Sequence, residues 1–225
     1  GLEIRAYNLF CRNFNSSRHR DSLLTSDSQH GSQLRSELLR AGYAETVITP
    51  PVGFEIEGPE HATRRATDVT DDLLGRVLVL EAGGDRAAIV TLDVWGVSDR
   101  FTARVVESVS SAAGVDESLV WIGVSGNATS PPLWDDGNAA YVQYAAYVPQ
   151  QIGGIAALAA GRLQDAELGF ATASLPDLAT SVNGRYEDLN EIVPMMIGDG
   201  VSGPIARVFG FSCPGAVIGG HSTDW

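Results

Sequence analysis

Arg76-Val77-Leu78-Val79-Leu80-Glu81 and Ala87-Ala88-Ile89-Val90-Thr91-Leu92-Asp93 are the two stretches of this sequence that decide its fold. Both are apolar and rich in β-branched residues, as strands are. Gly83-Gly84-Asp85 lies between them, and glycine supplies the positive φ that a tight hairpin needs. The second run is apolar on both faces, which favours a central strand. These stretches predict a β-hairpin in the middle of a sheet.

A helix is predicted directly after the hairpin. Ser98 offers an N-cap, with Asp99 in the first turn, and Gly114 suits the residue after the last turn. Apolar side chains recur between them at helical spacing, at Phe101, Val105, Val109 and Ala112.

Further strands and one long helix complete the pattern. Short strands are expected at Ala44–Thr49, Leu119–Val124, Glu167–Ala173 and Ile205–Ser212. A long helix is expected over Asn138–Leu163, with Pro149 and Gly153-Gly154 kinking or splitting it. This alternation predicts the α/β class, with a mixed β-sheet core and flanking helices.

Residues 1–40 differ from the rest in texture. They are rich in Arg, Ser and Asn, and their apolar residues lack a sustained period. We expect a poorly ordered N-terminal arm with a short helix near Leu34–Leu39, followed by one α/β domain over residues 41–225.

Composition excludes several partners and environments. The net charge is −13, and all fifteen basic residues are arginine, a pattern typical of GC-rich bacterial coding sequences. An acidic surface disfavours nucleic acid, and no apolar run is long enough to cross a bilayer. The two cysteines do not form a disulfide framework. No signal peptide is visible, so we expect a cytoplasmic protein or a secreted chain already processed.

Two loops are the places where chemistry is expected, because α/β enzymes carry catalytic groups after buried strands. These are Ser125–Trp134 and Cys213–Trp225.

Several phrases in this sequence resemble the neutral, non-lysosomal ceramidase family. Gly42-Tyr43-Ala44-Glu45-Thr46-Val47-Ile48-Thr49-Pro50 resembles that family's opening Gly-x-Ala-x-x-x-Ile-Thr-Pro phrase. Asn183-Gly184-Arg185 resembles its Asn-Arg element, and Phe211-Ser212-Cys213-Pro214 lies where the family has Cys-His-Pro. The resemblance covers about residues 41–225 and corresponds to the front half of the family's catalytic domain.

The resemblance implies an amidase fold whose zinc site is degenerate. The family hydrolyses the amide bond of ceramide with a zinc-activated water. Asn127 and Thr129 stand at the positions of its His-x-His phrase, and Cys213 stands at a later histidine. Amide and hydroxyl groups are not usual zinc ligands. We therefore expect no metal site and no cofactor, and zinc only if other residues rebuild the site; Cys213 and His221 are the sole candidates in these loops.

A second possibility for the same region is a cysteine nucleophile. Cys213 would attack, His221 would act as base and Asp224 would orient it, since an adjacent imidazolium stabilises a thiolate. A small buried thiol at a strand end is the alternative.

Four residues are candidates for substrate binding: Asn127, Ser130, Arg185 and His61. For Asn127 and Ser130, an Asx turn is the alternative to a hydrogen bond with a substrate carbonyl. Arg185 could hold a carboxylate or form a structural ion pair, and His61 could be a solvated loop residue. The nearby aromatic residues favour core packing over a ligand platform: Trp134, Tyr141, Tyr144 and Tyr147.

The sequence thus favours a divergent ceramidase-like hydrolase or acyl-transfer protein that acts on an amide or ester bond of a small molecule without the family zinc. A non-catalytic subunit that keeps the fold is the main alternative, and an intact zinc amidase with displaced histidines is a third. Because a front half would leave apolar surface uncovered, we expect association with a complementary chain or with a second copy.

Overall fold

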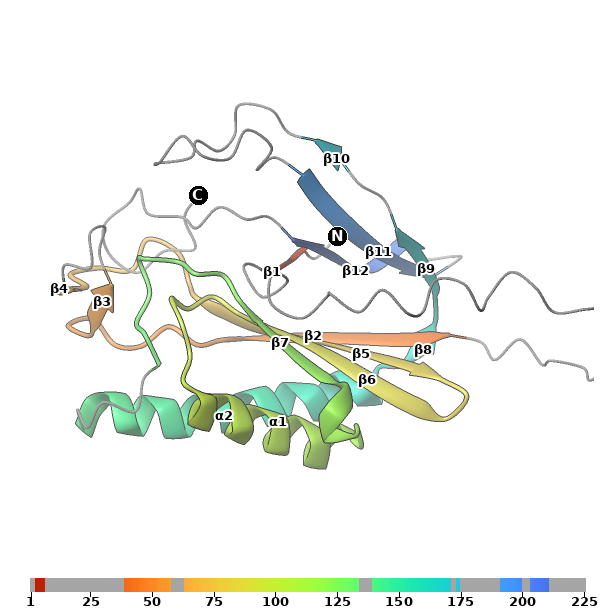
Figure 1. Ribbon diagram of the computed structural model, residues 1–225, viewed down its shortest axis with the longest axis horizontal. Helices are drawn as coiled ribbons and strands as arrows, with labels where there is room; N and C mark the ends of the chain where they lie inside the picture. The colour runs from red at the N-terminus through yellow and green to blue at the C-terminus, as the bar shows by residue number, and fades with distance from the viewer. Residues whose placement is uncertain are drawn as a thin grey trace, which may run out of the picture.

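The computed structural model describes residues 3–6, 39–57, 63–133, 139–170, 173–174, 191–199 and 203–210. These residues form three layers, with two helices on one face of a central sheet and a second sheet on the other face (Figure 1). The expected α/β class with a mixed sheet is confirmed.

The central sheet is built around the predicted hairpin. Its strand order is β7-β6-β5-β2-β8, with these bounds: β7 Val120–Val124, β6 Asp85–Leu92, β5 Leu74–Ala82, β2 Arg40–Val47 and β8 Gln164–Asp165. Strands β6 and β7 are parallel, and the other neighbours are antiparallel. Gly83 and Gly84 turn the hairpin with φ of 65° and 91°. β6 has a neighbour on each side, as predicted.

Helix α1, Asp99–Ala113, links the parallel pair β6 and β7. Ser98 caps it, its Oγ accepting from the Phe101 backbone N–H at 3.2 Å, and Gly114 ends it with φ of 65°. The local signals read from the sequence therefore set both ends of this helix. A short 3₁₀ turn, η2 Glu117–Leu119, precedes β7.

Helix α2, Ala139–Gly161, runs unbroken past Pro149, so the expected split does not occur. Val148 and Ile152, on either side of Pro149 along the helix, are fully buried against the sheet core. That packing carries the helix past the proline. Gly153 faces α1, where an added Cβ would lie 3.1 Å from the Cβ of Ser108. This glycine permits close helix packing and does not break the helix.

The second sheet has the order β1-β12-β11-β10, and β9 pairs with β11. Its strands are β1 Glu3–Ala6, β12 Gly203–Gly210, β11 Glu191–Asp199, β10 Ala173–Ser174 and β9 Glu167–Phe170. β1 pairs in parallel with β12, although it lies in the stretch expected to be an arm. Of the single strand expected over Glu167–Ala173, residues 171–172 lie outside the described residues, and the parts on either side, β9 and β10, pair with β11 in the same register. A separate two-stranded ribbon joins β3 Glu55–Glu57 to β4 Thr63–Arg65.

Strand alternation gives the central sheet a separate core on each face. Val77 and Val79 belong to the core under the helices, while Leu78 belongs to the core between the two sheets. All three are fully buried. The period-two pattern of β5 therefore serves two layers at once.

The structure corrects the predicted bounds of two strands, and one predicted helix falls almost entirely outside the described residues. β2 begins at Arg40, four residues before the expected start, because its first half pairs with both β5 and β8. β12 begins at Gly203, two residues before the expected start, and residues 211–212 of the expected strand lie outside the described residues. Apart from Leu39, the helix expected near Leu34–Leu39 lies outside the described residues. Among those residues, neither helix has the length and apolarity needed to cross a membrane.

Candidate functional site

The loops that follow the parallel strands β6 and β7 lie side by side. The backbone N–H of Gly126 donates to the carbonyl of Val94 at 3.1 Å, and that of Leu133 donates to Gly96 at 2.8 Å. Ser98 N–H returns a bond to the carbonyl of Leu133 at 3.0 Å. This is the edge where α/β folds place their functional groups.

The loop after β7 is polar and yet buried. Asn127, Thr129 and Ser130 are at most 2% exposed. Asn127 Oδ1 accepts from the backbone N–H of Thr129 at 2.9 Å and from its hydroxyl at 2.5 Å. The Ser130 hydroxyl donates to the Asn127 carbonyl at 2.6 Å. The loop is thus an Asx turn held by its own side chains.

These local bonds bear on the two substrate-binding candidates in this loop. A hydroxyl has one hydrogen to donate, and that of Ser130 is engaged by Asn127. A substrate carbonyl would have to compete for it. Asn127-Ala128-Thr129 also matches a glycosylation sequon, but its three residues are buried in the folded chain.

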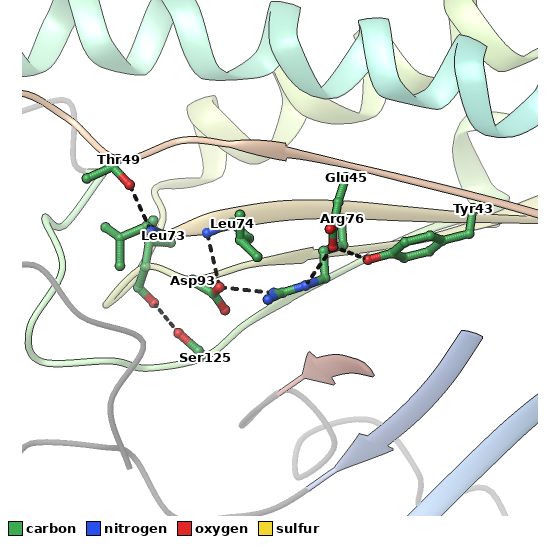
Figure 2. Close-up of polar contacts among 9 residues, drawn as sticks. Tyr43, Glu45, Thr49, Leu73, Leu74, Arg76, Asp93 and Ser125 are labelled. Atoms are coloured by element: carbon green, nitrogen blue, oxygen red, sulfur yellow. Dashed lines mark hydrogen bonds and ion pairs between the residues drawn. The ribbon is translucent and has the colours of Figure 1, made fainter. Parts of the chain in front are cut away.

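Asp93 closes the end of the hairpin next to this loop (Figure 2). Its Oδ2 accepts from the Leu74 backbone N–H at 3.0 Å and from Arg76 Nη1 at 2.9 Å. The Asp93 side chain is 4% exposed and that of Arg76 is 9% exposed. The carboxylate therefore joins the start of β5 to the end of β6 as a buried ion pair.

A row of polar side chains crosses the sheet at this level. Glu45, Arg76 and Thr91 are neighbours in register on β2, β5 and β6, on the face turned toward the second sheet. Tyr43 donates its hydroxyl to Glu45 Oε2 at 2.6 Å, and Arg76 Nε lies 3.7 Å from the same oxygen (Figure 2). Burial, followed by the bond to Glu45, raises the pKa of Tyr43.

Two buried atoms in this row have no hydrogen-bond partner. They are Arg76 Nε and Thr91 Oγ1, on adjacent strands. Buried polar atoms are nearly always paired, with protein groups or with ordered water, so these two atoms need a partner such as water. This row was not predicted from the sequence. Its signal in the sequence was Arg76 and Thr91, each of which interrupts the apolar part of its strand.

Of the four aromatic side chains near the loop, Tyr141 and Tyr144 pack in the core, as predicted. Tyr144 donates its hydroxyl to the Ile48 carbonyl, and Tyr141 donates to the Glu55 carbonyl at 3.0 Å. Phe54 meets both rings edge-on, with centroids 5.6 and 5.7 Å away. Tyr147 is 52% exposed, and Trp134 lies outside the described residues.

The side chains at positions 127 and 129 do not fit a zinc ion. They bond to one another, and neither supplies imidazole, thiolate or carboxylate. Across the part of the chain that the structure describes, no three His, Cys, Asp or Glu side chains gather as a metal site would need.

The other predicted site residues lie outside the described residues. These are Cys213, His221, Asp224, Arg185 and His61. Of the seven candidates, only Asn127 and Ser130 are therefore placed, and they lie together in one turn.

Comparison with known proteins finds similarity in structure alone. Neither protein-family models nor curated sequences match this chain. The neutral ceramidase from Pseudomonas aeruginosa matches with a TM-score of 0.61 and 16% identity, over 78% of this chain and 32% of its own. A ceramidase complexed with C2 matches with a TM-score of 0.57 and 18% identity, over 78% and 31%. The fold is thus ceramidase-like, and the chain spans about a third of the length of these structures.

Proposed function

We propose that this chain is a divergent ceramidase-like hydrolase or acyl-transfer protein that acts on an amide or ester bond of a small molecule without zinc. The observation that carries the proposal is the shared fold, together with the polar loop at the carboxyl ends of β6 and β7. Fold alone does not choose a substrate. The substrate class therefore has to be tested directly.

A zinc-free reaction is proposed because of the chemistry at positions 127 and 129. Asn127 and Thr129, which the resemblance places at the ceramidase family's His-x-His positions, supply an amide and a hydroxyl that hydrogen-bond each other. The attacking group must then come from elsewhere in the chain.

Cys213 is the proposed nucleophile. Its thiolate would attack the substrate carbonyl carbon, forming a C–S bond as the C–N or C–O bond breaks. His221 would take the thiol proton and give it to the leaving amine or alcohol, with Asp224 holding the imidazole. Water would then hydrolyse the thioester, releasing the acid and restoring the thiol. Transfer to another amine or alcohol in place of water would make the protein an acyltransferase.

Substrate binding is proposed for Asn127, Ser130, Arg185 and His61. The supporting observation concerns the first two, which lie in one turn beside the loop of β6. Arg185 would hold a carboxylate, and His61 would contact the leaving group.

The test combines metal analysis with a panel of N-acyl amines and acyl esters. We expect purified protein without stoichiometric zinc, and turnover that survives a chelator but is lost in Cys213→Ala. Cys11→Ala is the matched control, since it removes the other thiol of the chain. Stoichiometric zinc, or activity lost to the chelator, would overturn the proposal.

A non-catalytic binding subunit is the second candidate. The Asx turn favours it, because the side chain of Asn127 is engaged with the backbone N–H and the hydroxyl of Thr129. In that case no amide or ester is turned over, and wild type and Cys213→Ala bind a partner equally.

Association is the last part of the proposal. The part of this chain that matches covers about a third of the structures of similar fold. We propose that a complementary chain or a second copy covers apolar surface of the domain.

A further inference from the structure

In the part of the chain that the structure describes, strand β7 is an edge of the central sheet that lacks the usual protection against pairing. Within the described residues it pairs with β6 alone. Its five residues, Val120–Val124, include neither charge nor proline. Natural sheets protect edges with short strands, charges, prolines or bulges. The opposite edge follows that rule, since β8 is two exposed residues, Gln164 and Asp165.

Trp121 is the last member of a row of apolar side chains that crosses the central sheet, and it lies one strand beyond the part of the row that the second sheet covers. Tyr43, Leu78, Ile89 and Trp121 follow each other in register across four strands. The first two are buried in the core between the sheets, and Ile89 packs against it. Trp121 is 62% exposed, the largest exposed fraction among the large apolar side chains whose burial the structure describes.

The backbone of β7 has hydrogen-bonding groups to offer at this edge. The N–H of Ser125 donates to the Leu92 carbonyl of the β6 strand. Because a parallel pair bonds through alternate residues, Trp121 and Gly123 also point their backbone groups toward β6. Those of Val120, Ile122 and Val124 then point outward.

We infer that a second copy of this chain pairs with β7 in antiparallel fashion about a two-fold axis at Ile122. In that register Ile122 meets the partner's Ile122, and Val120 meets the partner's Val124. Trp121 then lies opposite the partner's Gly123. The outward N–H and C=O groups bond across the axis, and each indole lies over a residue without a side chain, where aromatic rings shield glycine.

This pairing is self-complementary, as a two-fold interface must be. A register shift would lose the Trp–Gly match or place two indoles face to face. The two central sheets would join into one continuous sheet of ten strands, five from each copy.

Interface size and charge define the strength of the dimer. Stable interfaces bury roughly 1,200–2,000 Å² in total. One five-residue pair, with roughly 150 Å² from each indole, falls short of that. The dimer is therefore reversible, with a Kd in the micromolar range or weaker. Each copy carries a charge of −13 while β7 carries none, so salt that screens the repulsion tightens the dimer.

The experiment is analytical ultracentrifugation of the whole chain from low micromolar to near-millimolar concentration, at low and high NaCl. We expect a monomer–dimer equilibrium that tightens with salt and weakens at least about tenfold in Trp121→Lys, because an edge lysine opposes strand pairing. Leu158→Lys is the matched control, since Leu158 is a similarly exposed apolar residue on α2, at 52%. It should leave the equilibrium unchanged.

Hydrogen exchange of the wild type gives a second measurement that needs no variant. The amides of Val120, Ile122 and Val124 should gain protection as concentration rises. A monomer throughout, a dimer indifferent to Trp121→Lys, or a dimer lost in Leu158→Lys overturns the inference. The inference rests on the association part of the proposed function only, so a monomer would leave the Cys213 chemistry to its own tests.

Discussion

Arg76 Nη1 lies 2.9 Å from Asp93 Oδ2, and both side chains are at least nine-tenths buried. The same carboxylate oxygen accepts the backbone N–H of Leu74. One acceptor thus fixes the first residue of β5 to the residue after β6, beside the candidate site (Figure 2).

Removing either partner of this pair is expected to cost much stability. Asp93→Ala should lower the free energy of unfolding by about 3–5 kcal/mol, because it leaves a buried guanidinium without its counter-charge. Urea unfolding monitored by circular dichroism measures it. The double variant Arg76→Met/Asp93→Ala should be more stable than Asp93→Ala alone, since no uncompensated charge remains. If Asp93→Ala lowers the free energy of unfolding by less than about 1 kcal/mol, as expected for an exposed ion pair, the pair is not buried as described.

A close approach of strand and helix is the basis of the second prediction. A Cβ added at Gly42 on β2 would lie 2.0 Å from the carbonyl oxygen of Ala159 on α2. Both are backbone positions, so the helix must move. Gly42→Ala should therefore destabilise by about 1–3 kcal/mol or more. Gly154→Ala is the control, since nothing lies within 4 Å of its Cβ; it should stabilise by up to about 1 kcal/mol.

These elements show which parts of the fold the sequence could predict. The β5–β6 hairpin and α1 were predictable because their signals are local: Gly83 and Gly84 for the turn, Ser98 and Gly114 for the caps. β1 was not predicted, because its pairing with β12 joins residues about two hundred positions apart. α2 was expected to kink or split because Pro149 is a helix breaker by local propensity, whereas the packing of Val148 and Ile152 is a tertiary effect.

The candidate site was predictable only as a place. The loop after β7 was expected to be functional, and the structure puts it beside the loop after β6. The polar row of Glu45, Arg76 and Thr91 depends on the register between three strands, and no local sequence pattern specifies that register.

Tyr144 provides a test of the contact between α2 and the segment after β2. Its hydroxyl donates to the Ile48 carbonyl, and burial raises its pKa. Tyr144→Phe should cost about 1–3 kcal/mol of unfolding free energy, because a buried carbonyl loses its donor. Tyr147→Phe, on the exposed face, should change it by less than about 0.5 kcal/mol.

The raised pKa of Tyr144 also predicts a difference at alkaline pH. The folded state favours the neutral form of Tyr144. The stability that the neutral ring contributes is therefore complete below the ordinary pKa of 10.0, and it falls as the pH rises toward the pKa of the folded state. The wild type should thus lose more stability than Tyr144→Phe between pH about 9.5 and 11. Parallel alkaline profiles would show that this ring is ionised equally in both states.

Glu81 gives the corresponding test at acid pH. Its carboxylate accepts from Arg86 Nε at 2.7 Å and from Arg40 Nη1 at 2.8 Å, and these bonds, that of Arg86 foremost, lower its pKa below the ordinary 4.5. A lowered pKa contributes stability that is complete above the ordinary value and lost as pH falls through the lowered one.

Glu81→Gln should therefore melt below the wild type at pH 6, with the gap closing as pH falls beneath the ordinary pKa of 4.5. Thermal unfolding across pH measures this. Asp85→Asn, in the exposed turn of the same hairpin, removes the same charge and serves as the control. A gap that stays constant with pH would point to altered packing and not to the carboxylate.

Asn127 separates the two roles considered for the loop after β7. If its Oδ1 acts by holding the Asx turn, Asn127→Ala leaves two buried donors of Thr129 without this acceptor and costs about 1–3 kcal/mol. Asn127→Asp keeps the acceptor and should restore the turn in part, despite its buried charge. A substrate-binding role predicts the reverse pattern: unfolding close to wild type in both variants, with KM raised and kcat little changed. Measuring unfolding and substrate kinetics on the same two proteins decides between the roles, because a turn holder changes stability first while a substrate contact changes binding alone.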